Sequence, residues 1–325
     1  MRRVLALAGV LLLAHLALLQ IHPAGAAASP AANTRDIGIV FDVGGRGDKS
    51  FNDGAYRGAE RAQRELGVRT HFIEPGEGSD RESGLRLLAA ERMGLVIGVG
   101  FIFTDDLTGL AREYPNVNFA GVDYALAFDT AGHVIPPPAN VAALKFREEQ
   151  GSFLVGALAA MVGGSKKVGF VGGMDIPLIH KFEAGYRAGV LHVCPDCTVI
   201  VQYAGVTPEA FRNPGKGKEL ALSQYEQGVN VIFHASGSTG LGVFEAARQE
   251  NKLAIGVDAV VYDQISRVRA GTFHGGIYEY GLAENGVGYV YDAHNAALIP
   301  DSVHVRLESL RAEIISGKIV VPSTR

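Results

Sequence analysis

A polar loop near the start of the chain combines several side chains that could bind a small ligand. It runs from Asp42 to Asp53 and contains Ser50 and Asn52, with glycines between them. The loop lies between a predicted strand and a predicted helix, so its backbone N–H groups and polar side chains could form hydrogen bonds in a cleft. Its glycine spacing matches neither the P-loop nor the dinucleotide-binding pattern. A capped loop with solvated charges is the alternative interpretation.

Two further carboxylates follow predicted strands. Asp105 comes after the strand over 95–99, and Asp123 comes after the strand over 117–121. A carboxylate buried without a partner is costly, but in a cleft it can accept hydrogen bonds from the N–H or O–H groups of a ligand. Asp105 could equally cap the helix that follows it. The sequence leaves both interpretations of Asp105 open.

The second half of the chain offers aromatic and glycine residues at comparable positions. Phe182 lies at the start of a predicted helix, Phe211 lies in a loop, and Gly237 follows a predicted strand. Glycines after that strand would allow close approach of the backbone to a ligand. By itself, this turn is a weak indication of an anion-binding site.

The sequence contains no recognisable catalytic or metal motif. The nucleophile motif G-x-S-x-G is absent, and the ten histidines form no H-E-x-x-H pattern. Carboxylates alone could support glycoside chemistry if two of them flanked the bond, so an enzyme remains an alternative. The net charge of −4 argues against nucleic-acid binding. We therefore predict no metal and no cofactor.

The two cysteines, Cys194 and Cys197, form a C-x-x-C pair. A zinc site would need further ligands at suitable spacing. A redox motif would open a helix after the first strand of a thioredoxin-like unit, whereas this pair follows a predicted helix and precedes a strand. We therefore predict a structural disulfide, formed in an oxidising compartment.

Alternating strand and helix patterns must position these residues. The apolar run over 37–41 is typical of a strand buried on both faces, and residues 55–66 show helical spacing of alanine and leucine. Similar strand–helix units continue to residue 121 and resume after residue 146. We therefore predict an α/β protein with two lobes, each a parallel sheet flanked by helices. The carboxyl ends of both sets of strands would face a shared crevice.

The predicted organisation has four parts. They are a signal peptide over 1–28, an N-terminal lobe over 36–145, a C-terminal lobe over 146–258, and a segment over 259–325 that returns across the lobes. Residues 124–145, which contain three consecutive prolines, are predicted to be a connector. Residues 318–321 are predicted to form a last short strand.

The N-terminal sequence predicts secretion. Arg2 and Arg3 precede an apolar run, and small residues up to Ala28 suit signal-peptide cleavage. An uncleaved membrane anchor is the alternative. The first cysteine is Cys194, so the sequence predicts no lipid-bearing cysteine near the cleavage site. The expected location is the periplasm.

Several motifs together resemble one known family. They are DVGG (42–45), DKSFN (48–52), GFIFTD (100–105), FREEQGSFLVG (146–156), FEAGY (182–186), PGKGKE (214–219) and GSTGLGV (237–243). These segments resemble the basic membrane protein (BMP) family, the purine-nucleoside-receptor-like substrate-binding proteins of ABC transporters. The resemblance implies a type I periplasmic-binding-protein fold. It also implies capture of a nucleoside, often a purine, and its delivery to an ABC permease in the inner membrane.

The resemblance also implies roles for individual residues. The Asn52 loop and Asp105 would hold the base, Phe211 would stack on it, and Asp258 would bind the ribose. Stacking on a base contributes roughly 1–3 kcal/mol, and a carboxylate suits a diol because it only accepts hydrogen bonds. The predicted ligand-binding residues are Asp42, Ser50, Asn52, Asp105, Phe182, Phe211, Gly237 and Asp258. No catalytic or metal-binding residue is predicted.

The chain departs from the family pattern after Asp258. Relatives usually carry a longer segment between this aspartate and the helix near Val261, including a lysine that helps to hold the ligand. We therefore hypothesise an altered hinge and a weakened or lost affinity for nucleosides. The predicted function is a monomeric extracytoplasmic substrate-binding protein of an ABC importer. The alternatives are a degenerate or non-transport receptor of the same fold and a nucleoside-hydrolysing enzyme.

Overall fold

The computed structural model describes residues 33–74, 80–257 and 261–324. The predicted signal peptide and Asp258 lie outside the described residues. Within the described ranges, no helix is both long and apolar enough to cross a membrane.

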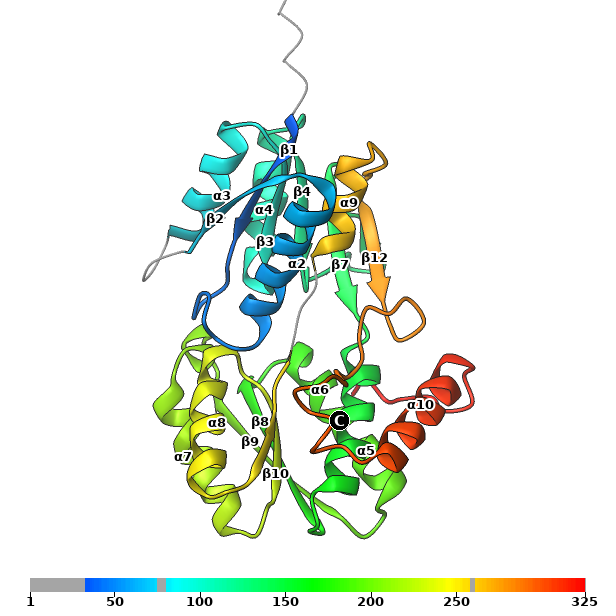
Figure 1. Ribbon diagram of the computed structural model, residues 1–325. Helices are drawn as coiled ribbons and strands as arrows, with labels where there is room; N and C mark the ends of the chain where they lie inside the picture. The colour runs from blue at the N-terminus through cyan, green and yellow to red at the C-terminus, as the bar shows by residue number, and fades with distance from the viewer. Residues whose placement is uncertain (1–32, 75–79, 258–260, 325) are drawn as a thin grey trace, which may run out of the picture. The chain divides into compact units, whose positions relative to one another are not determined.

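Six parallel strands form the first sheet, in the order β12-β7-β4-β3-β1-β2 (Figure 1). The strands are β1 (Asn33–Val40), β2 (Arg69–Ile73), β3 (Met93–Val99), β4 (Asn118–Val122), β7 (Val141–Phe146) and β12 (Gly276–Tyr280). Every residue of β3 is buried, as expected for an apolar strand between two layers of helices. The strand β12 comes from the C-terminal part of the chain and pairs with β7.

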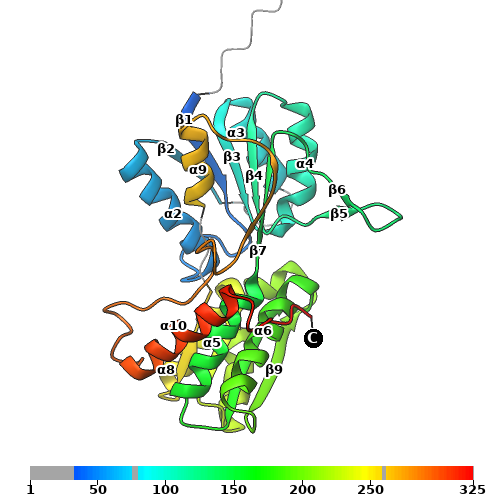
Figure 2. The same cartoon turned by 90° about the vertical axis from the view of Figure 1, so that its right-hand side faces the viewer.

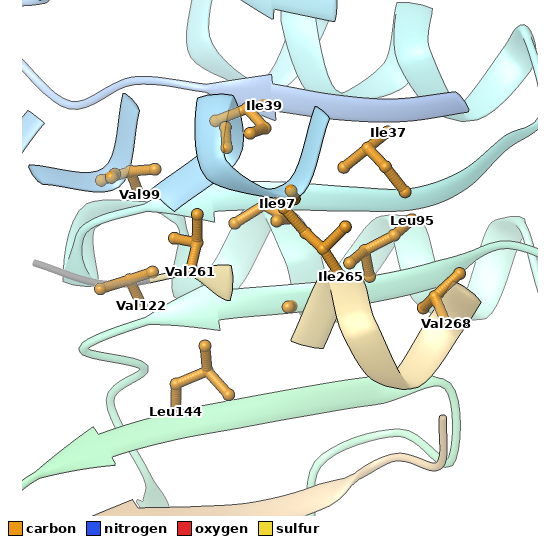
Figure 3. Close-up of a cluster of buried hydrophobic side chains, with 14 of the residues drawn as sticks. Ile37, Ile39, Leu95, Ile97, Val99, Val122, Leu144, Val261, Ile265 and Val268 are labelled. Atoms are coloured by element: carbon orange, nitrogen blue, oxygen red, sulfur yellow. The ribbon is translucent and has the colours of Figure 1, made fainter. Parts of the chain in front are cut away.

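Helices cover both faces of this sheet. The helices α2 (Phe51–Leu66) and α9 (Tyr262–Arg269) pack on one face through small and branched side chains. Ala59 belongs to α2, and Ile265 of α9 is labelled in Figure 3. The helices α3 (Asp80–Ala90) and α4 (Thr104–Glu113) pack on the other face. The helix α2 ends at Gly67, whose φ of 64° is the left-handed conformation that glycine adopts at helix ends.

Four parallel strands form the second sheet, in the order β11-β10-β8-β9. The strands are β8 (Lys167–Met174), β9 (Thr198–Gly205), β10 (Val231–Ala235) and β11 (Leu253–Ile255). One face packs against α5 (Glu148–Val162) and α6 (Pro177–Val193), and the other against α7 (Pro214–Glu226) and α8 (Gly240–Gln249). The helix α10 (Asp301–Ile315) packs on α5. The predicted α/β fold with helix-flanked parallel sheets is confirmed.

Two predicted elements are wrong. The supposed connector over 124–145 contains the hairpin β5 (Ala127–Phe128) and β6 (Val134–Ile135) and most of the inner strand β7. Figure 2 shows this hairpin extending away from the sheet. The buried run of β7 is only four residues long and follows the three prolines closely. Because prolines are typical of loops, the strand pattern of β7 was not recognised in the sequence. Residues 318–321 follow α10 without forming a strand.

The predicted disulfide is confirmed, because Cys194 and Cys197 are joined by an S–S bond. It closes the turn between α6 and β9. Each of these two elements packs in the core of the second sheet. The disulfide therefore lies in a structural turn, and its cysteines are distant in sequence from the polar loop over 42–53.

The chain passes between the two sheets three times. The passages are from β7 to α5, from β11 to α9, and from β12 to α10. The C-terminal part therefore contributes α9 and β12 beside the first sheet and α10 beside α5. The lobe boundaries at 145/146 and 258/259 stay a prediction.

Candidate ligand-binding site

Most of the predicted binding residues line one small cavity, with a volume of about 60 Å³, at the carboxyl ends of strands from both sheets. Those that line it are Asp42, Ser50, Asn52, Phe182, Phe211 and Gly237. Asp105 is exposed in the first turn of α4 and is not part of the lining. Asp258 lies outside the described residues.

The loop before α2 is organised by Asp48, which is fully buried. Its Oδ1 accepts hydrogen bonds from the backbone N–H groups of Ser50 (2.9 Å) and Asp53 (3.1 Å). Its Oδ2 accepts from the backbone N–H of Asn52 (2.9 Å) and from Asn52 Nδ2 (3.2 Å). One carboxylate thus satisfies N–H groups at the start of α2 that lack partners within the helix. It thereby fixes the positions of Ser50 and Asn52.

The side chains of Asn52 and Ser50 are themselves engaged by the protein. Asn52 Oδ1 accepts a hydrogen bond from the backbone N–H of Asp42 at 3.0 Å. Since Asn52 Nδ2 donates to Asp48, both the oxygen and the nitrogen of this side-chain amide form hydrogen bonds within the loop. Ser50 Oγ donates to the carbonyl oxygen of Val257 at 3.0 Å. This bond joins the loop after β1 to the segment that follows β11.

Two carboxyl groups, Asp42 after β1 and Asp123 after β4, line the cavity. Asp42 Oδ1 accepts from the backbone N–H of Val43 at 2.6 Å, and burial raises the pKa of Asp42 to about 7. Burial also raises the pKa of Asp123, and the nearby Glu148 raises it further. A carboxyl that titrates near neutrality can donate a hydrogen bond when protonated and accept when ionised.

The close approach of Asp42 to the neighbouring strand depends on Gly100. This residue follows β3 with a φ of 116°, and a Cβ atom there would lie 2.2 Å from Asp42 Oδ2. Glycine alone accommodates both the backbone conformation and the contact. Gly100 therefore leaves free the space that the carboxyl group of Asp42 occupies beside β3.

Aromatic rings complete the lining. Phe211 ends the short helix η2 (Pro208–Phe211), and its carbonyl oxygen accepts from Ser238 Oγ at 3.0 Å. Its ring meets the ring of Phe101 edge-on, with the centroids 6.4 Å apart. Phe182 enters the lining from α6. Rings from three separate elements thus converge with the two carboxyl groups.

The predicted set did not include Phe51, Phe101 and Asp123, which also line the cavity. Phe101 and Asp123 each come within two residues of a strand end in the first sheet. That position makes Asp123 a candidate carboxylate in the sequence and could also have identified Phe101, since strand carboxyl ends meet at one edge of a parallel sheet. Phe51 lies between two residues that were predicted.

The cavity carries no sign of metal chemistry or of a lysine contact. In the described ranges, no group of three or more histidine, cysteine, aspartate or glutamate side chains could hold a metal ion. No lysine is among the described residues that line the cavity. What the arrangement can do is bind a molecule that offers a planar apolar face and several hydrogen-bond donors.

Comparisons with known proteins place the chain in a family. The family described as ABC transporter substrate-binding protein PnrA-like (Bmp) matches residues 37–263. An uncharacterized lipoprotein from Pyrococcus horikoshii is 36% identical over 287 residues, covering 78% of this chain and 68% of the relative. The ABC transporter nucleoside-binding protein BmpA from Lactococcus lactis subsp. cremoris is 29% identical over 366 residues, covering 99% of each chain.

A solved structure agrees with these relatives. The crystal structure of an ABC transporter solute-binding protein from Aeropyrum pernix matches with a TM-score of 0.75 and 30% identity, covering 88% of this chain and 93% of the other. The Lactococcus alignment runs over 366 positions, more than the 325 residues of this chain. That relative therefore carries residues without a counterpart here. The chain belongs to the Bmp family of PnrA-like ABC transporter substrate-binding proteins.

Proposed function

We propose that this protein is the extracytoplasmic substrate-binding component of an ABC importer and that it binds a nucleoside, with a purine as the favoured base. The observation that carries the proposal is the cavity in which aromatic rings meet buried carboxyl groups at the ends of parallel strands. The printed name of the Lactococcus relative, a nucleoside-binding protein, supports the choice of ligand.

The proposed ligand contacts divide by chemistry. The ring of Phe211, with Phe182 nearby, would stack on the base, an interaction of roughly 1–3 kcal/mol. Asp42 and Asp123 would bind the N–H and O–H groups of the ligand, because carboxylates offer several acceptor positions. Asp258 would contact the ribose. Asp105 takes no part in this proposal, since it is exposed outside the lining.

The size of the cavity bears on how a ligand would be taken up. Its volume of about 60 Å³ is far below the roughly 300–1,000 Å³ of ordinary ligand pockets. A nucleoside would therefore require the walls of the cavity to separate and then close, as in hinge closure around a ligand. The three chain passages between the sheets would act as the hinge.

The proposal includes a location and partners. Residues 1–28 would be a cleaved signal peptide, and the mature protein would act in the periplasm as a monomer that delivers its ligand to an inner-membrane permease. It would bind without catalysis. N-terminal sequencing of the exported protein tests the cleavage, and a first residue other than Ser29 would contradict it.

Calorimetric titration of the mature protein, Ser29 to Arg325, with adenosine, guanosine, inosine, uridine and cytidine tests the ligand. Chromatography of the same mixtures tests for turnover. We expect saturable binding of at least one purine nucleoside and no release of free base. Absence of binding by a protein that unfolds cooperatively would overturn the nucleoside assignment. Release of free base would show that the protein hydrolyses nucleosides and would contradict its assignment as a binding protein.

A further inference from the structure

A second, larger cavity adjoins the candidate site along the edge of the second sheet. Its volume is about 670 Å³, which lies within the range typical of small-molecule sites. We call it the β11-edge cavity. It shares four lining residues with the smaller cavity, namely Phe51, Asp123, Phe182 and Val257. The proposed nucleoside contacts leave most of its surface unused.

The cavity exists because the strand β11 lies at an edge of its sheet. In the described part of the chain, β11 pairs only with β10, and the N–H of Leu253 donates to the carbonyl oxygen of Asn230 at 3.0 Å. Hydrogen-bonding groups alternate along a strand, so those of Ala254 and Gly256 face away from β10. Both residues line the cavity. The sheet edge therefore forms one wall, and no second strand among the described residues pairs with the backbone groups that face it.

The remaining walls are mainly apolar and come from distant parts of the sequence. Helix α5, strand β10, the segment 286–290 and the turn before α10 all contribute. Examples are Val155, Leu158, Val162, Phe233, Val287 and Ile299. Burial of an apolar body against such walls is favourable in proportion to the area removed from water.

The lining of the cavity includes an acceptor atom that is buried and, among the described residues, without a hydrogen-bond partner. Glu148, the first residue of α5, is 4% exposed and lines the cavity. Its Oε2 accepts from Lys181 Nζ at 3.0 Å, whereas its Oε1 has no hydrogen-bond partner in the part of the chain that the structure describes. A buried acceptor left without a donor is costly. A donor supplied by a ligand would remove that cost.

We propose that the β11-edge cavity is a second ligand site, for a molecule with an apolar body and a hydroxyl head. The head donates to Glu148 Oε1, and the body lies along β11 against the apolar walls. A neutral head suffices because the Lys181 ammonium already balances the carboxylate charge. The site does not depend on nucleoside binding, so it can be tested whether or not the proposed function holds.

Two isomers of identical formula test the role of the donor. We expect octan-1-ol to bind the purified protein saturably by calorimetry, and 1-methoxyheptane, which lacks an O–H group, to bind about tenfold more weakly. In Glu148→Leu this difference should disappear. Absence of saturable octan-1-ol binding, or equal affinity of the two isomers for the unmodified protein, would overturn the proposal.

A cavity-blocking variant separates specific binding from adsorption. Gly288 lines the cavity, and a Cβ atom there would meet no atom within 4 Å. The backbone therefore leaves room for a side chain at this position, and Gly288→Phe is designed to reduce the space in the cavity. Gly288→Ala is the matched control. We expect octan-1-ol binding to be lost in Gly288→Phe and kept in Gly288→Ala. An isotherm unchanged by Gly288→Phe would mean surface adsorption and would contradict the site, even if Glu148→Leu failed to fold.

Discussion

The two walls of the candidate cavity differ in chemistry. Among the described lining residues, the carboxyl and amide side chains all come from the wall of the first sheet, namely Asp42, Asn52 and Asp123. The wall from the second sheet is mainly apolar and includes Leu178, Ile179, Phe182, Phe211 and Ala235. A bound ligand would thus direct its polar edge toward the first sheet and a ring face toward the second. Variants that alter one wall at a time test this division.

The largest effect is expected where the polar wall is anchored. Asp48→Ala removes a buried carboxylate that accepts four hydrogen bonds, three of them from backbone N–H groups. Since each buried donor left unsatisfied costs about 1–3 kcal/mol, we expect the free energy of unfolding to fall by about 3–5 kcal/mol in urea denaturation. Asp48→Asn, which keeps one acceptor oxygen, should lose about half as much. A loss below about 1 kcal/mol in Asp48→Ala would mean that the loop finds other partners.

The next effect depends on pH. Burial raises the pKa of Asp42 from 3.8 to about 7, so between these values the folded protein binds a proton that the unfolded chain releases. The contribution of this group to stability therefore falls as the pH rises from about 4 to 7. Asp42→Asn should remove this pH dependence. Its free energy of unfolding, relative to that of the unmodified protein, should therefore rise by on the order of 3 kcal/mol between pH 4 and pH 8.

Urea denaturation across that pH range provides the measurement. Asp196→Asn is the control, because its side chain is 80% exposed and pairs only at the surface with Lys166. A stability difference between Asp42→Asn and the unmodified protein that does not change with pH would show that burial leaves the Asp42 carboxyl unperturbed.

Part of the polar wall, the wall from the first sheet, could be predicted from local sequence pattern. A buried apolar run followed by Asp42, Ser50 and Asn52 indicates the end of a parallel strand, and such ends meet at one edge of the sheet. The choice between Asp105 and Asp123 could not be predicted in the same way. Both follow strands, but Asp105 turns outward in the first turn of α4, whereas Asp123 follows β4 directly with a φ of 57°. The two aspartates thus differ in the backbone conformation that follows each strand, and the strand pattern in the sequence does not show this conformation.

Other features depend on contacts distant in sequence. The engagement of Asn52 by Asp42 and Asp48 needs the folded loop. The open edge at β11 follows from which strands pair, and the first sheet, by contrast, gains β12 from the C-terminal part of the chain. The inner strand β7 was missed because its short buried run follows three prolines. Local pattern thus predicts the strand–helix order but not which sheet receives each late element.

The apolar wall is tested by Phe211→Ala. Loss of a stacking ring should weaken nucleoside binding by about 2 kcal/mol, roughly thirtyfold, in calorimetric titration. The hydrogen bond that holds this loop uses the carbonyl oxygen of Phe211 and survives the substitution. Phe128→Ala, in the exposed hairpin, is the matched control and should leave affinity unchanged. Equal nucleoside affinities of Phe211→Ala and the unmodified protein would show that the ring of Phe211 does not stack on the base.

The smallest effect concerns the bond that joins the two walls. Ser50→Ala removes the hydrogen bond from Ser50 Oγ to the carbonyl oxygen of Val257 and should lower the free energy of unfolding by about 1 kcal/mol. Ser165→Ala removes a bond of the same length to the carbonyl oxygen of Gly228 at an exposed position, so a smaller loss is expected there. Since ligand access requires the walls to separate, Ser50→Ala should also raise the association rate constant for a nucleoside by about fivefold. Equal losses for the two serine variants, with no change in association rate, would show that Ser50 does not hold the walls together.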